Sequence, residues 1–391
     1  MLKDLFLLDP QIVFLNHGSF GACPRPVFEI YQDWQKQLEQ QPVQFLWTEL
    51  DNNLQQSRQE LGRYIHAFAS DIVYIPNATH GVNIIARSLL LHPGDEILTT
   101  DHEYGACNFT WDFVSQKTGA TYKHQAIEMP VISNVEIVDQ LWRGVTPRTK
   151  VIFISHITSP TSLTLPVQLI CQRARDSGII TIIDGAHAPG QISLDLSSLQ
   201  ADFYVGNCHK WMLSPKGAGF LFARPEVQKL IEPLIVSWGY QSRLTSPHES
   251  TFIDFLQWSG TKDPAAALSV PAAIAFMRKY RWDDVRVRCH KLLRTAIERI
   301  CNHTGLSPLY PLDSEFYHQM GTIPIPNIKD LTKLKTCLCH EYRIEIPCVE
   351  WNGQHFLRLS VQGYNSEEEI DLLVRALTKL IPDEVVISDK R

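Results

Sequence analysis

Residues 72–223 alternate between short hydrophobic runs and longer stretches of helical periodicity. Runs of apolar or β-branched residues lie at 72–75, 96–98, 151–154, 179–183, 203–205 and 217–222. After the first run, residues 79–91 carry Val82, Ile85, Ala86 and Leu89 at the spacing of one helix face. Short apolar runs bounded by glycine and polar residues are typical of buried strands in a parallel sheet. The pattern predicts a large, doubly wound, mainly parallel α/β domain.

The pattern changes after about Pro264. Long helical stretches at 265–280 and 285–301 precede shorter strand patterns near 321–325, 343–349 and 355–361. A last helix is expected over 366–380, opened by a capping box of Ser366 and Glu369. We expect a smaller α+β domain formed by residues 264–391 together with the N-terminal segment 1–16. The large domain would then span residues 17–263.

Composition narrows the possible functions. A chain of 391 residues is long enough for two or three domains, and its net charge is −6 without a basic block. This balance argues against a nucleic-acid partner. The apolar runs are too short to span a membrane, and Asp4, Asp9 and Pro10 interrupt any signal-peptide core. Nine scattered cysteines, an odd number without framework spacing, indicate free thiols in a reducing cytoplasm.

The most informative chemistry lies at the ends of two hydrophobic runs. Asp184 and His187 follow the run at 179–183, and Lys210 follows the run at 203–205. The carboxyl ends of parallel strands meet at one sheet edge, where ligands of open α/β folds bind. A lysine and a carboxylate at one site suit pyridoxal 5'-phosphate (PLP). The amine can form a Schiff base with its aldehyde, and the carboxylate can keep its ring nitrogen protonated.

Simpler interpretations exist for both residues. Lys210 could be a surface lysine after a strand, and Asp184 could be the N-cap of a following helix. The apolar strand before Lys210 and Trp211 after it favour partial burial, which lowers a lysine pKa and makes the amine nucleophilic. Lys216 and Lys262 lie in glycine-containing loops without such a strand.

Three further positions have both a structural and a functional interpretation. The turn at 77–81, with Asn77 and Thr79, could cap a helix, bind a phosphate at the helix start, or do both. Tyr104 could lie flat on a planar cofactor or be an ordinary core or surface tyrosine. Arg358, inside a strand pattern, could be an edge-strand residue or could bind a substrate carboxylate with its planar guanidinium.

The cysteines suggest no metal site. Cys337, Cys339 and His340 lie in a helical stretch, where residues i and i+2 do not share a face. Cys208 and Cys348 are expected to be strand or core thiols. We expect no metal.

With these motifs, the chain resembles the PLP-dependent enzymes of the class V aminotransferase fold, fold type I. This group includes cysteine desulfurases, C–S lyases and isopenicillin N epimerase, and the epimerase-like members resemble the chain most. The resemblance covers nearly the whole chain. It is carried by the segments 16–21, 77–81, 101–104, 155–160, 184–191, 207–211, 238–239, 260–261 and 358–365.

The resemblance implies a role for each matching residue. Lys210 would bind the PLP aldehyde, Asp184 would pair with the ring nitrogen, His187 would lie near the phenolic oxygen, and Tyr104 would stack on the ring. The phosphate and the rest of the cofactor would be held by Asn77, Ala78, Thr79, Ser159, Asn207 and His209. Thr261 would reach the phosphate of a neighbouring subunit, which implies a homodimer with shared active sites. The substrate would meet Arg358, Asn16 and His17, with Arg358 on its α-carboxylate.

Departures from the desulfurase pattern shape the expected reaction. The asparagine that desulfurases place near the phenolic oxygen is replaced by the turn at 158–160, and no loop typical of a nucleophilic cysteine surrounds Cys348. We therefore expect chemistry at the α-carbon of an amino acid, free or within a small peptide. Epimerisation is the first expectation and C–S β-elimination the second, followed by transamination and desulfuration. The second acid that an epimerase needs is left open between His17, His80 and others.

Two other classes fit the sequence less well. A PLP-binding regulator without activity would tolerate loss of Arg358 or Tyr104, and both are present. A nucleotide-binding Rossmann enzyme would need a Gly-x-Gly-x-x-Gly turn after a strand, and the sequence has none.

Overall fold

A seven-stranded sheet forms the centre of the molecule in the computed structural model, which describes residues 2–241 and 251–381. Its strand order is β2-β8-β7-β6-β5-β3-β4, and the last five strands in this order run parallel. β8 is antiparallel to both of its neighbours. The strands are β2 (Ile72–Ile75), β3 (Glu96–Thr100), β4 (Thr121–Gln125), β5 (Thr149–Ser155), β6 (Ile180–Gly185), β7 (Phe203–Asn207) and β8 (Gly219–Ala223). The predicted large, mainly parallel α/β sheet is confirmed.

Helices cover both faces of this sheet, which explains the hydrophobic runs. Along β5, Val151 and Phe153 belong to one core while Ile152 and Ile154 belong to the other, because successive side chains of a strand point to opposite faces. The face that carries Val151 and Phe153 packs against α4 (Ala78–Ser88), α5 (Gly105–Thr118) and α11 (Phe252–Gln257). The face that carries Ile152 and Ile154 packs against α6 (Asn134–Trp142), α7 (Val167–Asp176) and α8 (Leu196–Leu199).

The C-terminal part contains a smaller antiparallel sheet. Its order is β11 (Cys348–Trp351), β12 (Gln354–Ser360) and β9 (Met320–Ile325). The helices of this part are α14 (Trp282–Thr304), α15 (Leu331–His340) and α16 (Glu367–Leu380). α14 packs on β9 and on α16, and α16 begins with the predicted capping box.

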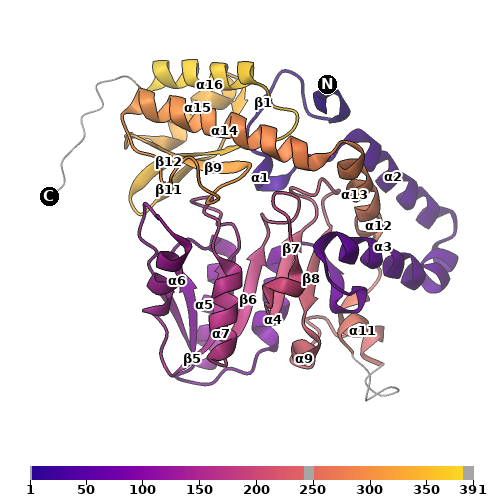
Figure 1. The fold of residues 1–391 in the computed structure, drawn as a ribbon. Helices are drawn as coiled ribbons and strands as arrows, with labels where there is room; N and C mark the ends of the chain where they lie inside the picture. The colour runs from indigo at the N-terminus through magenta and orange to yellow at the C-terminus, as the bar shows by residue number, and fades with distance from the viewer. Residues whose placement is uncertain (1, 242–250, 382–391) are drawn as a thin grey trace.

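The N-terminal segment joins this smaller part. β1 (Val13–Phe14) pairs in parallel with β10 (Ile344–Glu345). In Figure 1 the indigo N-terminal segment accordingly lies beside the orange and yellow C-terminal elements, above the large sheet. The assignment of residues 1–16 to a separate small domain stays a prediction.

The helices that connect the two parts pack together at one side of the sheet. α12 (Ala265–Leu268) and α13 (Val270–Lys279) contact α2 (Arg25–Gln40) and α3 (Leu50–Ile65). Residues on both sides of position 263 therefore share one core, and the domain division at that position stays a prediction. The remaining short elements are η1 (Leu2–Leu5), α1 (His17–Phe20), η2 (Gln44–Glu49), η3 (Ala69–Asp71), α9 (Pro225–Gln228) and η4 (Trp238–Gln241).

No helix within residues 2–241 and 251–381 combines the length and the apolar character that crossing a bilayer requires.

Candidate active site

The carboxyl ends of β5, β6 and β7 form the floor of a cavity of about 380 Å³. Ser155 on β5 is in register with Asp184 on β6, and Lys210 follows the end of β7 by three residues. The cavity is lined by Ser19, Phe20, Asn77, Ala78, Thr79, Tyr104, Ser155, Ile157, Ser159, Asp184, Ala186, His187, Asn207, His209 and Lys210. The structure thus brings together most of the residues singled out in the sequence.

Lys210 offers an amine that loses its proton easily. Its side chain is partly exposed, toward the cavity that it lines, but protein atoms surround it closely. This desolvation, reinforced by the charge of Arg358, lowers the pKa of Lys210 to about 8, and Asp184 opposes the shift. A substantial fraction of free amine at neutral to mildly alkaline pH is what attack on an aldehyde requires.

Asp184 is a buried carboxylate with two hydrogen-bond donors. Oδ1 accepts from the Ala186 amide at 2.9 Å, and Oδ2 lies 3.5 Å from the Cys107 thiol. Burial raises the pKa of Asp184, while the Ala186 amide and the charge of Lys210 lower it. The helix N-cap interpretation is wrong, because the residues after Gly185 form turns and the next helix, α8, is capped by Asp195. A buried carboxylate beside an open cavity is suited to pairing with a cationic ligand.

The beginning of α4 supplies polar groups at the Asn77 side of the cavity. Asn77 caps this 11-residue helix by accepting from the His80 amide, and the Ala78 amide donates to Asn207 Oδ1 at 2.8 Å. The capping interpretation of Asn77 is therefore confirmed. Thr79, in the first turn, also lines the cavity, where a helix N-terminus favours an anion. Phosphate binding here stays a prediction.

His209 lies near the same groups. Its Nδ1 is 2.9 Å from the Ala218 carbonyl, which can only accept, so Nδ1 carries the proton. Burial lowers the pKa of His209 to about 4, which leaves Nε2 without a proton at neutral pH. Binding a phosphate through Nε2 would require a second proton on this ring, which a nearby dianion would favour.

Arg358 lies on β12, in a smaller pocket that adjoins the cavity and shares Tyr104 and Ser159 with it. One terminal nitrogen, Nη1, donates to the Ser159 carbonyl and hydroxyl, and Nη2 donates to Ser19 Oγ. Nε is buried and has no hydrogen-bond partner among the described residues. A buried donor without a partner is costly, but Nε is closed off from the pocket, so the second N–H of Nη2 is the donor that a ligand acceptor could use. Burial lowers the pKa of Arg358 only to about 10, and the side chain stays cationic.

Asn16 supports this arginine indirectly. Ser19 Oγ donates to Asn16 Oδ1 at 2.5 Å, and Asn16 Nδ2 donates to Glu345 at 3.0 Å. Asn16 therefore orients the serine that contacts Arg358, and it does not line the cavity.

Several residues at the site were given no role in the sequence analysis. Ser19 and Phe20 come from α1, and Ser155 comes from the end of β5. Glu103 accepts hydrogen bonds from the Ser155 amide and hydroxyl and from the Thr100 hydroxyl. Burial raises the pKa of Glu103 to about 7, although these hydrogen bonds act to lower it. The available signal for Ser155 and Glu103 was their position next to strand ends already assigned to the site.

Other expected residues lie outside the cavity. His17 is buried behind Lys210, with Nε2 3.0 Å from the Lys210 carbonyl, and His80 does not line the cavity. Thr261 is exposed and does not line the Lys210 cavity, so its role toward a partner subunit stays a prediction. Substrate contact by His17 also stays a prediction.

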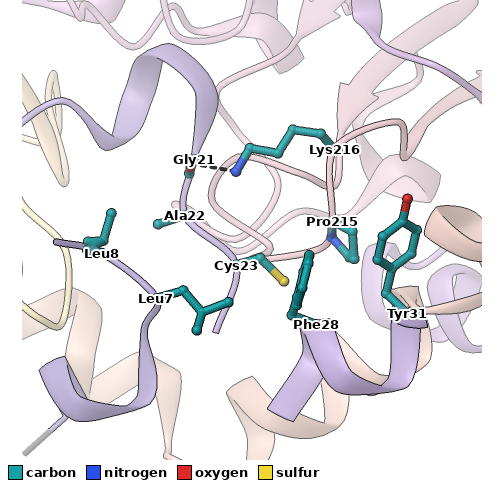
Figure 2. Close-up of a pocket in the computed structure, with 9 residues that line it drawn as sticks. All are labelled: Leu7, Leu8, Gly21, Ala22, Cys23, Phe28, Tyr31, Pro215 and Lys216. Carbon is teal, nitrogen blue, oxygen red and sulfur yellow. Dashed lines mark hydrogen bonds between the residues drawn. The ribbon is translucent and has the colours of Figure 1, made fainter. Parts of the chain in front are cut away.

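The competing lysine Lys216 belongs to a different cavity. Figure 2 shows its amine reaching the Gly21 carbonyl, at 2.9 Å, in a pocket of about 390 Å³ that also includes Cys23 and Phe28. Asp184 does not line that pocket. Lys216 therefore lacks the carboxylate that accompanies Lys210.

The cysteines lack the features of a nucleophile or metal site. Cys208 is buried after β7, and Cys348 is half-buried on β11, away from the cavity wall. Burial raises the pKa of Cys348 to about 12, which keeps its thiol protonated. Among the described residues, no three histidine, cysteine, aspartate or glutamate side chains are grouped as metal ligands.

Known proteins resemble the chain over nearly its whole length. The aminotransferase class V family model matches residues 23–373. Isopenicillin N epimerases from Streptomyces clavuligerus and Amycolatopsis lactamdurans are 35% and 33% identical, each over 97% of both chains. A probable chloroplastic L-cysteine desulfhydrase from Arabidopsis thaliana is 28% identical, over 96% of this chain and 84% of its own.

Solved structures share the fold. A cysteine desulfurase from Thermococcus onnurineus aligns with a TM-score of 0.81 at 18% identity, over 97% of both chains. C-DES, solved with glycine covalently linked to its PLP cofactor, aligns with a TM-score of 0.77 at 20% identity, over 94% of this chain and 96% of its own. The cavity fits the same cofactor, because it combines a free amine, a buried carboxylate and a helix start. The chain therefore belongs to the class V aminotransferase family and is a PLP-dependent enzyme.

Proposed function

We propose that the protein acts at the α-carbon of an amino acid, free or within a small peptide, and that epimerisation is its reaction. The observation that carries the proposal is the pairing of the Lys210 cavity with the buried, partly unpartnered guanidinium of Arg358 next to it. An amine-reactive site beside a carboxylate-binding site matches the two functional groups of an α-amino acid. The two isopenicillin N epimerases support the choice of reaction.

When bound, PLP withdraws electrons from the α-carbon and so weakens its bond to hydrogen. The protein's own residues then decide where protons go. Asp184 holds a proton on the ring nitrogen, which requires the carboxylate to be ionised. Lys210, once its amine is free, accepts the α-proton and can return it, because its lowered pKa suits both roles near neutral pH.

Arg358 would orient the substrate. Its Nη atoms are fixed by Ser159 and Ser19, so the guanidinium plane is set before a ligand arrives. Nη2 uses one of its two N–H groups on Ser19, and the other is left as the donor toward a carboxylate. A substrate fixed at its carboxylate and at its amine has little freedom left, which holds the α-hydrogen in one orientation.

Epimerisation also requires a proton donor on the other face of the α-carbon. Neither His17 nor His80 lines the cavity. Tyr104 does, and it also borders the Arg358 pocket, so a side chain with an ionisable hydroxyl lies between the two. We assign Tyr104 as the candidate for this second proton transfer.

β-Elimination is the alternative reaction, favoured by the desulfhydrase relative. It needs a leaving group on the β-carbon and no donor on the second face. Desulfuration has less support, because the Cys348 thiol lies off the cavity wall and stays protonated. Transamination is the remaining outcome and would release a keto acid.

One experiment separates these reactions. The purified enzyme is incubated in D₂O with chiral amino acids, small peptides, L-cysteine and L-cystine, while optical rotation, keto acid and sulfide are followed. An epimerase exchanges the α-hydrogen for deuterium in both stereoisomers and forms no keto acid. The variant Tyr104→Phe should keep exchange in one stereoisomer and lose inversion. Pyruvate from L-cystine, without inversion of any substrate, would establish β-elimination instead.

We further propose a homodimer with shared active sites in the cytoplasm. Thr261 is exposed in the chain and lies outside its own cavity, which is compatible with reaching the phosphate of a partner. Nine cysteines without disulfides are compatible with a reducing compartment.

A further inference from the structure

We infer that Trp211 is a positioning residue that fixes the proton of His187 on Nε2, where it faces the amine of Lys210. This inference deepens the proposed function and rests on Lys210 as its reactive amine. The observation is a short chain of hydrogen bonds from the indole through the imidazole to the lysine.

The tautomer follows from the donor and acceptor capacities of the partners. Trp211 Nε1 lies 3.3 Å from His187 Nδ1, and an indole N–H can only donate. His187 Nδ1 must therefore accept and carries no proton. Burial and the nearby charge of Lys210 keep the pKa of His187 well below its usual value, so the ring is neutral and its one proton is on Nε2.

That proton points at the reactive amine. His187 Nε2 is 3.3 Å from Lys210 Nζ, so it can donate to a neutral amine and has no lone pair to offer an ammonium. The arrangement favours the form of Lys210 that reacts. The other tautomer would present a lone pair and favour the ammonium.

A second histidine is fixed in the same way at the backbone of Lys210. His17 Nε2 is 3.0 Å from the Lys210 carbonyl, an acceptor, so Nε2 carries the proton. His17 Nδ1 must then accept from the Tyr364 hydroxyl, at 3.0 Å. The imidazole N–H of His17 therefore binds the backbone of Lys210, while that of His187 faces its side chain. The ring centroids of His17 and Trp211 lie 4.9 Å apart.

The ionisation of Lys210 depends on several groups, which the test must hold constant. The groups that interact with it are Asp184, Arg358, Cys107, His187, His17 and His209. A variant that deletes only the indole N–H leaves all of them in place.

The experiment replaces Trp211 with β-(3-benzothienyl)alanine, which keeps the bicyclic shape and has sulfur in place of the N–H. Two quantities are measured on the full chain, the first with and without PLP and the second without it. The first is the tautomer of His187, from the ¹⁵N shifts of histidine-labelled protein assigned with His187→Gln. The second is the pH midpoint for reductive labelling of Lys210 by pyridoxal and cyanoborohydride.

We expect the wild type to show a protonated Nε2 on His187. The substituted protein should populate the Nδ1 tautomer, and the Lys210 midpoint should rise by about one pH unit, the effect of one hydrogen bond. The matched control is the same replacement at Trp111, whose buried Nε1 has no hydrogen-bond partner among the described residues. It should change neither quantity.

A protonated Nδ1 in the wild type would overturn the inference, and so would an unchanged tautomer and midpoint after replacement of Trp211. Failure of the proposed function looks different. In that case the tautomer and the midpoint behave as expected, but no amino acid exchanges its α-hydrogen.

Discussion

Single side chains at the site are tuned by desolvation. Lys210 illustrates this, because burial lowers its pKa to about 8 from the ordinary lysine value of 10.5. The free amine therefore increases as the pH rises through about 8. We expect reductive labelling of the protein without PLP to follow that midpoint, and peptide mapping to place the label on Lys210. Lys210→Ala should lose activity by several orders of magnitude.

Lys216→Ala is the control for that prediction. Lys216 is also partly desolvated, with a lowered pKa, but it lies in the separate pocket of Figure 2. The Lys216→Ala variant should retain PLP attachment through Lys210. A label found on Lys216 or Lys262 in the wild type would contradict the assignment.

Asp184 provides the second prediction at this scale. Asp184→Asn keeps the shape of the side chain but removes the charge that holds a proton on the ring nitrogen. PLP should still attach to Lys210, while exchange of the substrate α-hydrogen slows by roughly 10²-fold or more. The measurement is deuterium incorporation from D₂O. Cys107→Ala, which removes only the weak thiol donor to Asp184, should have a much smaller effect.

Arg358 is the carboxylate-binding group of the proposed site. Arg358→Ala should raise KM for α-carboxylate substrates. The rise should correspond to a loss of about 2–4 kcal/mol of substrate binding free energy, because a desolvated charged contact is lost. Arg358→Lys should recover only part, since an ammonium cannot replace the planar contacts to Ser159 and Ser19. Substrate amides serve as the comparison. If the amides bind wild-type enzyme as well as the acids, the carboxylate role is wrong.

At the scale of elements, the short helix α1 and the Lys210 loop are packed backbone to backbone. Gly21, at the end of α1, has φ of +69°, and a Cβ there would lie 2.1 Å from the His209 carbonyl oxygen. Gly21→Ala should therefore displace the loop that carries Lys210. We expect a loss of stability of about 3 kcal/mol or more, together with weaker PLP binding.

Gly305→Ala is the matched control. Gly305 has a similar φ of +70°, but a Cβ there would meet nothing within 4 Å. It should cost only the strain of the left-handed backbone, about 1 kcal/mol, and leave PLP binding unchanged. Thermal unfolding and PLP titration of both variants test the comparison. Equal effects would show that the contact with His209 is unimportant.

At the scale of the whole molecule, the proposed dimer predicts complementation between subunits. In the proposed dimer, each site combines Lys210 of one subunit with Thr261 of the other. One variant, Lys210→Ala, lacks the amine, and a second variant lacks the loop around Thr261. Each variant should be inactive alone. After mixing under conditions of subunit exchange, a heterodimer has one intact site, so a fraction of the activity should return. A monomer in light scattering, with full PLP affinity, would refute the shared site.

The hydrophobic pattern alone determined most of the large sheet and the residues at its strand ends. The runs at 151–154 and 179–183 are buried on both faces, and such burial leaves a continuous apolar signal in the sequence. Asp184 and Lys210 were identified because strand ends are local features. β4 was missed because it is an edge strand, Thr-Tyr-Lys-His-Gln, with polar residues facing solvent. The doubly wound fold and the meeting of Asp184 and Lys210 in one cavity were therefore predictable.

Only the tertiary structure decided which distant segments meet around Lys210. Ser19 contacts Arg358 across 339 positions of the chain, and His17 contacts the Lys210 carbonyl across 193. No local periodicity encodes such contacts, because they depend on how β1 and the small sheet dock against the large one. The same docking decides the protonation of Lys210, since desolvation and neighbouring charges are properties of the assembled site. The sequence thus specified the reactive groups, and the packing of remote segments specified their ionisation and orientation.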